Sequence, residues 1–324
     1  MHGGALNGSL PAPSGQVSGG VGAEVGVKVG AVVVFYYPDA ACIERANRLA
    51  SALHCVVVDN TPSIHAASDL GLSSAIDYLP NGENVGIATA INQGVANLLR
   101  AEVEVAILFD QDSEPPAELL TELPNLIAQA NQAGERVALI GPAYEDLRLR
   151  GVAPFVRFRH WTLERVAPQG RDLIEVDFLI TSGSCINLRY WSAIGAMDDA
   201  LFIDFVDLEW CLRAKLGGYR ILGAPWIRMR HELGGEPVRV FGRAYPMHSP
   251  LRHYYLFRNA VALMRRPNLP LSWKSTELVK MPVRLVIYSL MPTQRRQHLK
   301  MALRGLWDGW RGKLGRFDSS RPSS

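Results

Sequence analysis

The stretch VEVAILFDQD (Val103–Asp112) decides the fold, because it joins an apolar strand pattern directly to two carboxylates. A short apolar run that ends in polar residues is typical of a strand buried on both faces. Carboxylates at positions i and i+2 after such a strand can converge on one hard divalent cation, Mg²⁺ or Mn²⁺. An acidic loop that caps the next helix has the same letters, so the neighbouring elements decide between the two interpretations.

Three similar apolar runs precede this stretch, at Val29–Tyr36, His54–Val58 and Ile76–Leu79. Residues 84–99 carry apolar side chains at helical spacing, and another apolar run follows at Val137–Ile140. Strands that alternate with helices at this spacing predict an α/β fold with a parallel sheet and helices on both faces.

Ligands bind to such sheets at the carboxyl ends of the strands. Here these ends carry Tyr36, Asp59 and the Asp110–Asp112 pair. The position of the pair after a buried strand therefore favours a metal and diphosphate site over a helix cap. Asp59 alone fits equally a contact with a nucleoside or a turn acid.

The pattern changes after Pro142. Strands are expected at Ile174–Ile180 and Ser184–Leu188, around the small-residue turn formed by Thr181, Ser182 and Gly183. A helix is expected over Val206–Lys215, stopped by two glycines.

A second group of acids lies in the segment FIDFVDLEW, which contains Asp204, Asp207 and Glu209. In the first turn of the expected helix, Asp207 is favoured in its ionised form by the helix macrodipole. An ionised carboxylate at this place can remove a proton from an attacking hydroxyl group. A helix start decorated with acids is the alternative. His231, after a strand-like stretch, is a candidate third metal ligand or an ordinary surface histidine.

The charge of the chain is concentrated at its C-terminal end. The whole chain has a net charge of +3, whereas residues 251–316 contain 14 Lys and Arg and two acids, a net charge of +12. Bases interleaved with tryptophans fit an anionic lipid surface. Nothing resembling a base-reading motif points to nucleic acid. The alternative to lipid binding is an ordinary helical surface exposed to solvent.

The chain lacks the sequence motifs of several other enzyme classes. No GxGxxG follows the first strand, which disfavours a nicotinamide-dependent oxidoreductase, and neither GxxxxGK[ST] nor GxSxG occurs. The four cysteines show no CxxC spacing, and there is no secretory signal or apolar stretch of about 20 residues.

Several motifs together resemble the family 2 glycosyltransferases of the GT-A fold, and within them the bacterial rhamnosyltransferases that use dTDP-L-rhamnose. These motifs are FYYPD (Phe35–Asp39), VVDN (Val57–Asn60), NVGIATAINQG (Asn84–Gly94), LFDQDS (Leu108–Ser113), TSGS (Thr181–Ser184), FIDFVDLEWCLRA (Phe202–Ala214) and LWDGWRGK (Leu306–Lys313). Within this group, the chain resembles most the enzymes that add the second rhamnose of rhamnolipids.

The resemblance implies a role for single residues. Donor binding would involve Tyr36, Asp59, Asn84, Gly86, Asn92, Asp110 and Arg258, the last from the recurring stretch RHYYLFRN. The metal ligands would be Asp110, Asp112 and His231, and the acceptor sugar would meet Thr181, Ser182, Gly183 and Glu209. Asp207 falls on the catalytic aspartate of the family, with Asp204 as its rival because Val206 replaces the usual preceding acid.

Composition, charge and the resemblance together predict the division of the chain. We expect a disordered leader at 1–27, a GT-A catalytic domain at 28–248 and a basic, helical, membrane-associating region at 249–324. Within the catalytic domain, residues 28–142 would bind the nucleotide and 143–248 the acceptor.

The expected reaction is an inverting transfer of L-rhamnose from dTDP-L-rhamnose to mono-rhamnolipid, with Mg²⁺ or Mn²⁺, by a cytoplasmic protein on the inner face of the inner membrane. The alternative acceptor is a polyprenyl-diphosphate-linked glycan of O-antigen or polysaccharide assembly. A non-catalytic module that binds a nucleotide sugar or a glycan is the third alternative. The sequence leaves the oligomeric state open.

Overall fold

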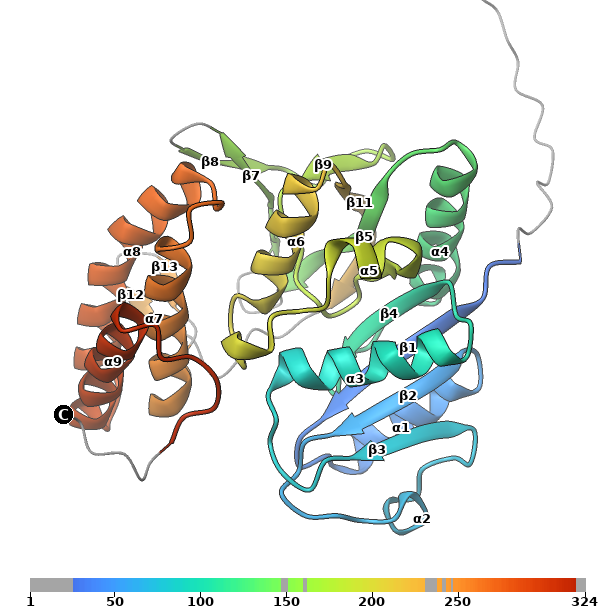
Figure 1. Cartoon of the computed structure of the whole chain (residues 1–324), viewed down its shortest axis with the longest axis horizontal. Coiled ribbons are helices and arrows are strands. Elements are labelled where there is room, and N and C mark those ends of the chain that lie inside the picture. The colour runs from blue at the N-terminus through green and yellow to red at the C-terminus, as the bar shows by residue number, and fades with distance from the viewer. Residues whose placement is uncertain are drawn as a thin grey trace, which may run out of the picture.

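The computed structural model describes residues 26–146, 151–159, 162–230, 238–240, 243–245 and 247–318. A mixed α/β body holds the central sheet, and three long C-terminal helices form a layer beside it (Figure 1). The expected leader, except for residues 26 and 27, lies outside the described residues.

Among the described residues, nine strands form one sheet in the order β3-β2-β1-β4-β10-β5-β11-β9, with β6 paired to β5. The strands are β1 (Val29–Phe35), β2 (His54–Asp59), β3 (Ile76–Pro80), β4 (Val105–Asp110), β5 (Val137–Asp146), β6 (Gly151–Val152), β9 (Ile174–Val176), β10 (Cys185–Asn187) and β11 (Arg220–Arg230). Two small two-stranded sheets stand apart: β7 (Phe155–Arg159) with β8 (Thr162–Val166), and β12 (Val238–Val240) with β13 (Arg243–Tyr245).

The two faces of the sheet have separate cores because side chains alternate along each strand. On β1, Ala31 and Val33 pack with α1 (Ala40–Ala50) and α4 (Ala117–Gln132). Val32 faces the other side, toward α3 (Ile87–Arg100) and α6 (Val206–Leu216). The expected helices on both faces of the sheet are therefore present.

The parallel part of the sheet brings together the strand ends that carry candidate site residues. Val34 is paired with Asp110 and Phe35 with Asp59, so β1, β2 and β4 end at one edge. The residues that follow these strands consequently lie side by side, as the sequence predicts for a nucleotide site.

One strand departs from the parallel pattern. β10 lies antiparallel between β4 and β5. Because of this insertion, Gly183 N donates to Leu108 O at 2.7 Å and the 181–184 turn lies beside the end of β4. The strand expected over residues 174–180 is shorter, since β9 pairs with only three residues of β11 before the chain leaves the sheet edge.

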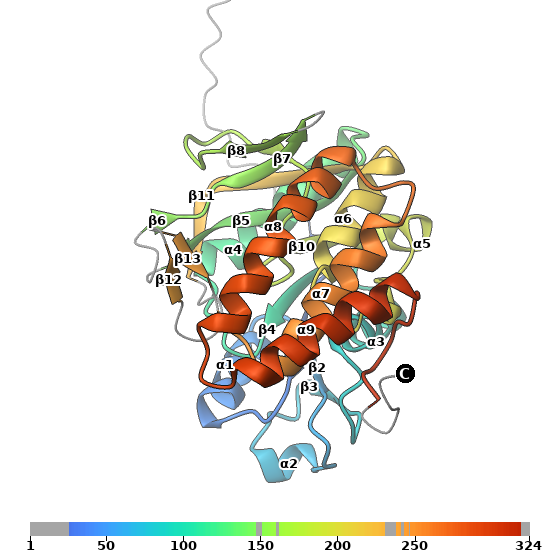
Figure 2. The ribbon, with the colours of Figure 1, turned by 90° about the vertical axis from the view of Figure 1, so that its left-hand side faces the viewer.

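The C-terminal layer consists of α7 (Pro250–Met264), α8 (Leu271–Leu290) and α9 (Arg295–Trp310), and Figure 2 shows α8 and α9 lying outside α7. Glycines permit the close approach of α7 and α9. A Cβ atom on Gly305 would lie 2.4 Å from Tyr254 O, and one on Gly309 would lie 2.4 Å from Arg258 O. Short helices α2 (Ala67–Leu70) and α5 (Trp191–Ile194) complete the α-helices of the described chain.

Candidate active site

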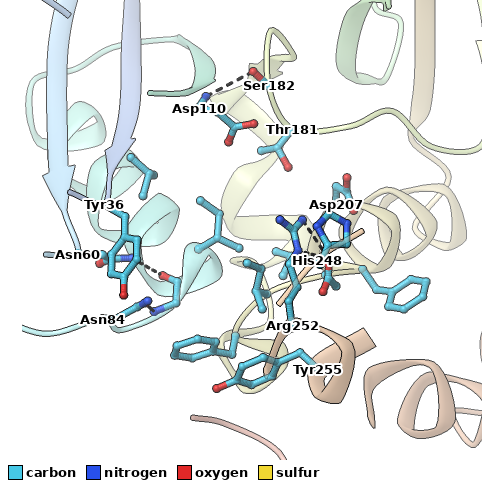
Figure 3. A pocket seen from close by; sticks show the side chains of 18 of the residues that line it. Tyr36, Asn60, Asn84, Asp110, Thr181, Ser182, Asp207, His248, Arg252 and Tyr255 are labelled. Carbon is cyan, nitrogen blue, oxygen red and sulfur yellow. Dashed lines mark hydrogen bonds and ion pairs between the residues drawn. The ribbon is translucent and has the colours of Figure 1, made fainter. Parts of the chain in front are cut away.

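A cavity of about 760 Å³ opens where the carboxyl ends of β1 and β4 face the beginnings of α6 and α7. Figure 3 shows its wall: Tyr36, Asn60 and Asn84 on one side, Asp110, Thr181 and Ser182 on a second, and Asp207, His248 and Arg252 on a third. Residues from seven separate segments therefore meet around one space, which is large enough for a drug-sized ligand.

Hydrogen bonds between side chains and backbone groups hold the side of the cavity that contains Tyr36. Tyr36 N donates to Gln111 Oε1 at 2.8 Å, which ties the loop after β1 to the loop after β4. Asn84 Oδ1 accepts from Gly86 N at 3.0 Å, and Asn60 Nδ2 donates to Gly86 O at 3.2 Å. Gly86 has φ +88°, and a Cβ there would lie 2.6 Å from Phe202 O, so the motif glycine is required by space and by backbone.

Asp59 lies behind this wall, outside the residues that line the cavity. Its carboxylate accepts from Thr61 N and from the Tyr78 hydroxyl group, both at 2.8 Å, and it is almost fully buried. Burial and the hydrogen bond to Asp59 raise the pKa of Tyr78. In this arrangement Asp59 shapes the loop after β2.

Asp110 and Asp112 both line the cavity, as their position after β4 predicts. Asp110 N donates to Ser182 Oγ at 3.3 Å, which joins this loop to the turn before β10. Two carboxylates offer the oxygen ligands that Mg²⁺ or Mn²⁺ prefers, so these residues fit a cation that shares its shell with diphosphate oxygens. Within the described residues, no cluster of three or more His, Cys, Asp and Glu could hold a metal ion. His231, the expected third ligand, lies outside them.

Asp207 is the cavity carboxylate best prepared to accept a proton. It stands in the first turn of α6, and its Oδ1 accepts from Leu208 N at 2.8 Å. Burial, together with the neighbouring charges of Asp204 and Asp110, raises its pKa to about 6. A base with a pKa near the working pH combines a large ionised fraction with a useful proton affinity.

Asp204 differs from Asp207 in its partners. Arg252 Nε and Nη2 both donate to its Oδ1 at 3.3 Å, while Oδ2 is buried without a hydrogen-bond partner among the described residues. Burial raises its pKa, and the charge of Arg252 opposes that rise. One oxygen of this carboxylate is thus already committed to an ion pair.

The backbone before α6 is strained. The φ values are +65°, +64° and +65° at Phe202, Asp204 and Phe205, in a backbone region that residues other than Gly rarely adopt. Asn259 Nδ2 holds the segment by donating to the carbonyl groups of residues 201, 203 and 204. Strain of this kind is found at functional sites, where the surrounding structure maintains it.

Besides Asp59, four more of the described residues expected in the site do not line the cavity. The Asn92 amide bridges α3 to Met197 and Asp199. Arg258 is fully buried, and its guanidinium group donates to Leu201 O at 2.8 Å and to Gly315 O. The other two are Glu209, which is paired with Arg213 and Arg266, and Gly183, whose space is closed by Met229.

Residues that the sequence analysis did not select also line the cavity, among them His248, Arg252 and Tyr255. The signal for Arg252 and Tyr255 was the stretch RHYYLFRN, from which Arg258 was chosen instead of Arg252. Six residues correspond to about 240° around a helix, so the two arginines cannot both face the cavity. Burial and the charge of Arg252 lower the pKa of His248 to about 4.

Comparison with known proteins gives one close relative in sequence. The chain is 30% identical over 292 residues to the dTDP-rhamnosyl transferase RfbF of Shigella flexneri, which is 88% of this chain and 96% of that protein. No family model matches the chain.

Solved structures show the fold. TarS 1–349 of S. aureus in complex with UDP-GlcNAc has a TM-score of 0.54 and 15% identity, over 87% of this chain and 80% of TarS. A second TarS 1–349 structure has a TM-score of 0.51 and 16% identity, over 87% and 81% of the two chains. GalNAc-T7 with UDP, GalNAc and Mn²⁺ has a TM-score of 0.49 and 14% identity, over 78% of this chain and 54% of GalNAc-T7, so the chain spans about half of that protein.

The likeness to TarS confirms the predicted GT-A fold. The likeness to RfbF extends over nearly all of both chains, and it confirms the predicted activity class. The chain therefore belongs to the dTDP-rhamnosyl transferases, and it is a rhamnosyltransferase.

Proposed function

We propose that the cavity binds dTDP-L-rhamnose and that Asp207 acts as the base of an inverting transfer. The observation that carries this proposal is the Asp207 carboxylate in the cavity wall, with its pKa raised to about 6. On this proposal, Asp207 accepts the proton of the acceptor hydroxyl group as its oxygen attacks the anomeric carbon.

Asp207 is preferred over Asp204 because of their partners. Asp207 accepts from the backbone N–H of Leu208, whereas Asp204 is paired with the Arg252 guanidinium group. Protonation of Asp204 would weaken that ion pair, so its charge is better suited to positioning Arg252 and to raising the proton affinity of its neighbour.

The donor side of the proposal follows the walls of the cavity. Tyr36, Asn60 and Asn84 would contact the nucleoside and the sugar, with Asp59 supporting their loop from behind. Asp110 and Asp112 would hold a divalent cation, which stabilises the charge on the departing dTDP. Thr181 and Ser182, on the wall beside Asp110, would meet the transferred or accepting sugar.

For the acceptor, we propose a polyprenyl-diphosphate-linked glycan of O-antigen or polysaccharide assembly, at an anionic membrane surface. The similarity to the dTDP-rhamnosyl transferase RfbF favours this acceptor over mono-rhamnolipid. Mono-rhamnolipid is the second candidate, because the motifs from FYYPD to LWDGWRGK resemble the enzymes that extend rhamnolipids.

The decisive measurement is the release of dTDP from dTDP-L-rhamnose with each acceptor, in the presence of Mg²⁺ or EDTA. Release that depends on a lipid-linked glycan, and that is lost in Asp207→Asn, supports the whole proposal. Release only with mono-rhamnolipid would instead assign the protein to rhamnolipid synthesis. Tight donor binding without release from any acceptor would favour a non-catalytic binding module.

A further inference from the structure

The helix α8 is apolar on its exposed face as well as on its buried one, where Trp273, Ile287 and Tyr288 pack into the core. Six large apolar side chains on its outward face are 46–71% exposed. They are Leu271, Leu278, Val279, Val283, Val286 and Leu290, here named the α8 ridge. On the inward side, Arg284 donates to Glu277, whose side chain is only 3% exposed. A helix on a water-exposed surface carries polar side chains on its outward face, so the ridge is suited to an apolar environment.

A second apolar stripe runs along α9. Leu299, Leu303, Trp307 and Trp310 follow one another at intervals of four and three residues and are 40–64% exposed. Figure 2 shows α8 and α9 in front of α7, meeting at one end and diverging from there, and the two helices are in direct contact. The two stripes therefore belong to one side of the molecule, and tryptophan is the residue favoured where an apolar layer meets water.

The charges of this layer are of one sign. From residue 249 to 317 the only acids are Glu277 and Asp308, and both are buried. Exposed bases flank the ridge at Arg295, Arg296 and Lys300. The first two stand in the first turn of α9, where the helix macrodipole disfavours a cation. These bases therefore oppose the dipole of their own helix, and their exposed side chains are accessible to an external anion.

We infer that the α8 ridge and the α9 stripe dock on an anionic lipid surface, with the apolar side chains in the headgroup region and the bases on the lipid phosphates. A second copy of this chain fits less well, because two such surfaces would bring bases against bases. The inference rests on the membrane association in the proposed function, and is independent of which glycolipid is the acceptor.

The cavity lies next to this surface. Its wall includes Leu251, Arg252 and Tyr255, which belong to α7, and α7 packs directly under α9. A lipid-anchored acceptor with its tail in the bilayer would thus present its head group to an enzyme already held at the same membrane. Among the described residues, no helix is both long and apolar enough to cross the bilayer itself.

The test is co-sedimentation of the full chain with vesicles of phosphatidylcholine alone or mixed with phosphatidylglycerol in equal parts. We expect binding to the mixed vesicles that weakens with salt. The double variant V279E/V286E should weaken it at least tenfold, since it places two carboxylates in the ridge. Arg295→Gln and Arg296→Gln should each weaken it about fivefold.

Ile64→Glu is the matched control, because Ile64 is 73% exposed and belongs to the loop before α2, a helix that Figure 1 shows well away from α7, α8 and α9. Retained vesicle binding by this variant, and a native circular dichroism spectrum for every variant, would assign the loss to the ridge. Wild-type protein that ignores anionic vesicles, or V279E/V286E that binds like wild type, would overturn the inference. So would a wild-type dimer that V279E/V286E converts to a monomer in analytical ultracentrifugation. Vesicle binding needs neither donor nor acceptor, so its failure is distinct from failure of the transfer assay.

Discussion

The Asp207 carboxylate accepts a hydrogen bond from the Leu208 amide group. It also lies close to two other negative charges, those of Asp204 and Asp110. Asp207→Asn keeps the shape and the hydrogen-bond acceptor but removes the charge. We expect kcat of dTDP release to fall about 10²–10⁴-fold, while dTDP still binds in isothermal titration calorimetry. A variant that turns over at the wild-type rate would place the base elsewhere, with Asp204 the first residue to examine.

The same substitution should stabilise the protein. The pKa of Asp207 is about 6 in the folded state, against about 3.9 for an unperturbed aspartate. The folded state therefore binds the proton more tightly, and this carboxylate costs stability as pH rises from about 4 to about 6. At pH 7, Asp207→Asn should raise the free energy of unfolding by about 3 kcal/mol, with no gain below pH 4. Urea unfolding at the two pH values measures the difference, and an equal effect at both would contradict it.

Asp204 is expected to act on catalysis through its neighbour. Its charge is one of the causes that raise the pKa of Asp207. Asp204→Asn should therefore move the acidic limb of the kcat/KM profile to lower pH while leaving the enzyme active. A profile that keeps its midpoint would show that Asp204 does not contribute to the proton affinity of the base.

At the scale of single residues, the sequence predicts the positions of residues that directly follow a strand or begin a helix. Asp110, Asp112 and Asp207 line the cavity as expected, because one element sets each position. Arg258 could not be separated from Arg252 without knowing which face of α7 is buried. The buried contacts of Glu209 depend on Arg266, 57 residues away, and no local pattern reveals them.

At the scale of elements, the close contact of α7 and α9 depends on two glycines. Gly305→Ala would bring a methyl group to 2.4 Å from Tyr254 O. We expect the two helices to separate and the free energy of unfolding to fall by about 1–3 kcal/mol. Gly151→Ala, with nothing within 4 Å of the added atom, is the control and should be nearly neutral in the same denaturation experiment. Equal stability of both variants would contradict this account of the interface.

The sequence predicts the parallel strands well, since each has an apolar run and a polar end. It does not reveal that β10 enters the sheet antiparallel between β4 and β5. The strand Cys185–Asn187 has three residues, and its direction depends on partners that lie 45 or more positions earlier in the chain. Pairing over such distances is decided by packing, which short patterns do not encode.

At the scale of the whole molecule, Arg258 connects the C-terminal layer to the catalytic segment. Its guanidinium group donates to Ala200 O, Leu201 O and Gly315 O, and no part of it is exposed. Arg258→Met would remove three hydrogen bonds from a buried charged donor at once, at a cost of about 3 kcal/mol or more.

We expect Arg258→Met to lower Tm and also to impair dTDP release, because the segment at 200–205 leads to the cavity wall. Arg265→Met, which changes an exposed arginine of the same layer, is the control and should cost less than about 1 kcal/mol. Differential scanning calorimetry and the release assay measure the two effects. Lost stability with undiminished kcat would show that the layer and the catalytic segment are independent.

The position of β10 has a consequence for how the newly made chain folds. β4 and β5 come early in the sequence, but neither has its shared neighbour until residues 185–187 have been synthesised. Until then both strands present open edges, which readily pair with other chains. Synthesis of the first 146 residues therefore yields an aggregation-prone intermediate, and a gene cut at this point should give an insoluble product. The antiparallel strand covers the facing edges of β4 and β5, and β11 later covers the other edge of β5.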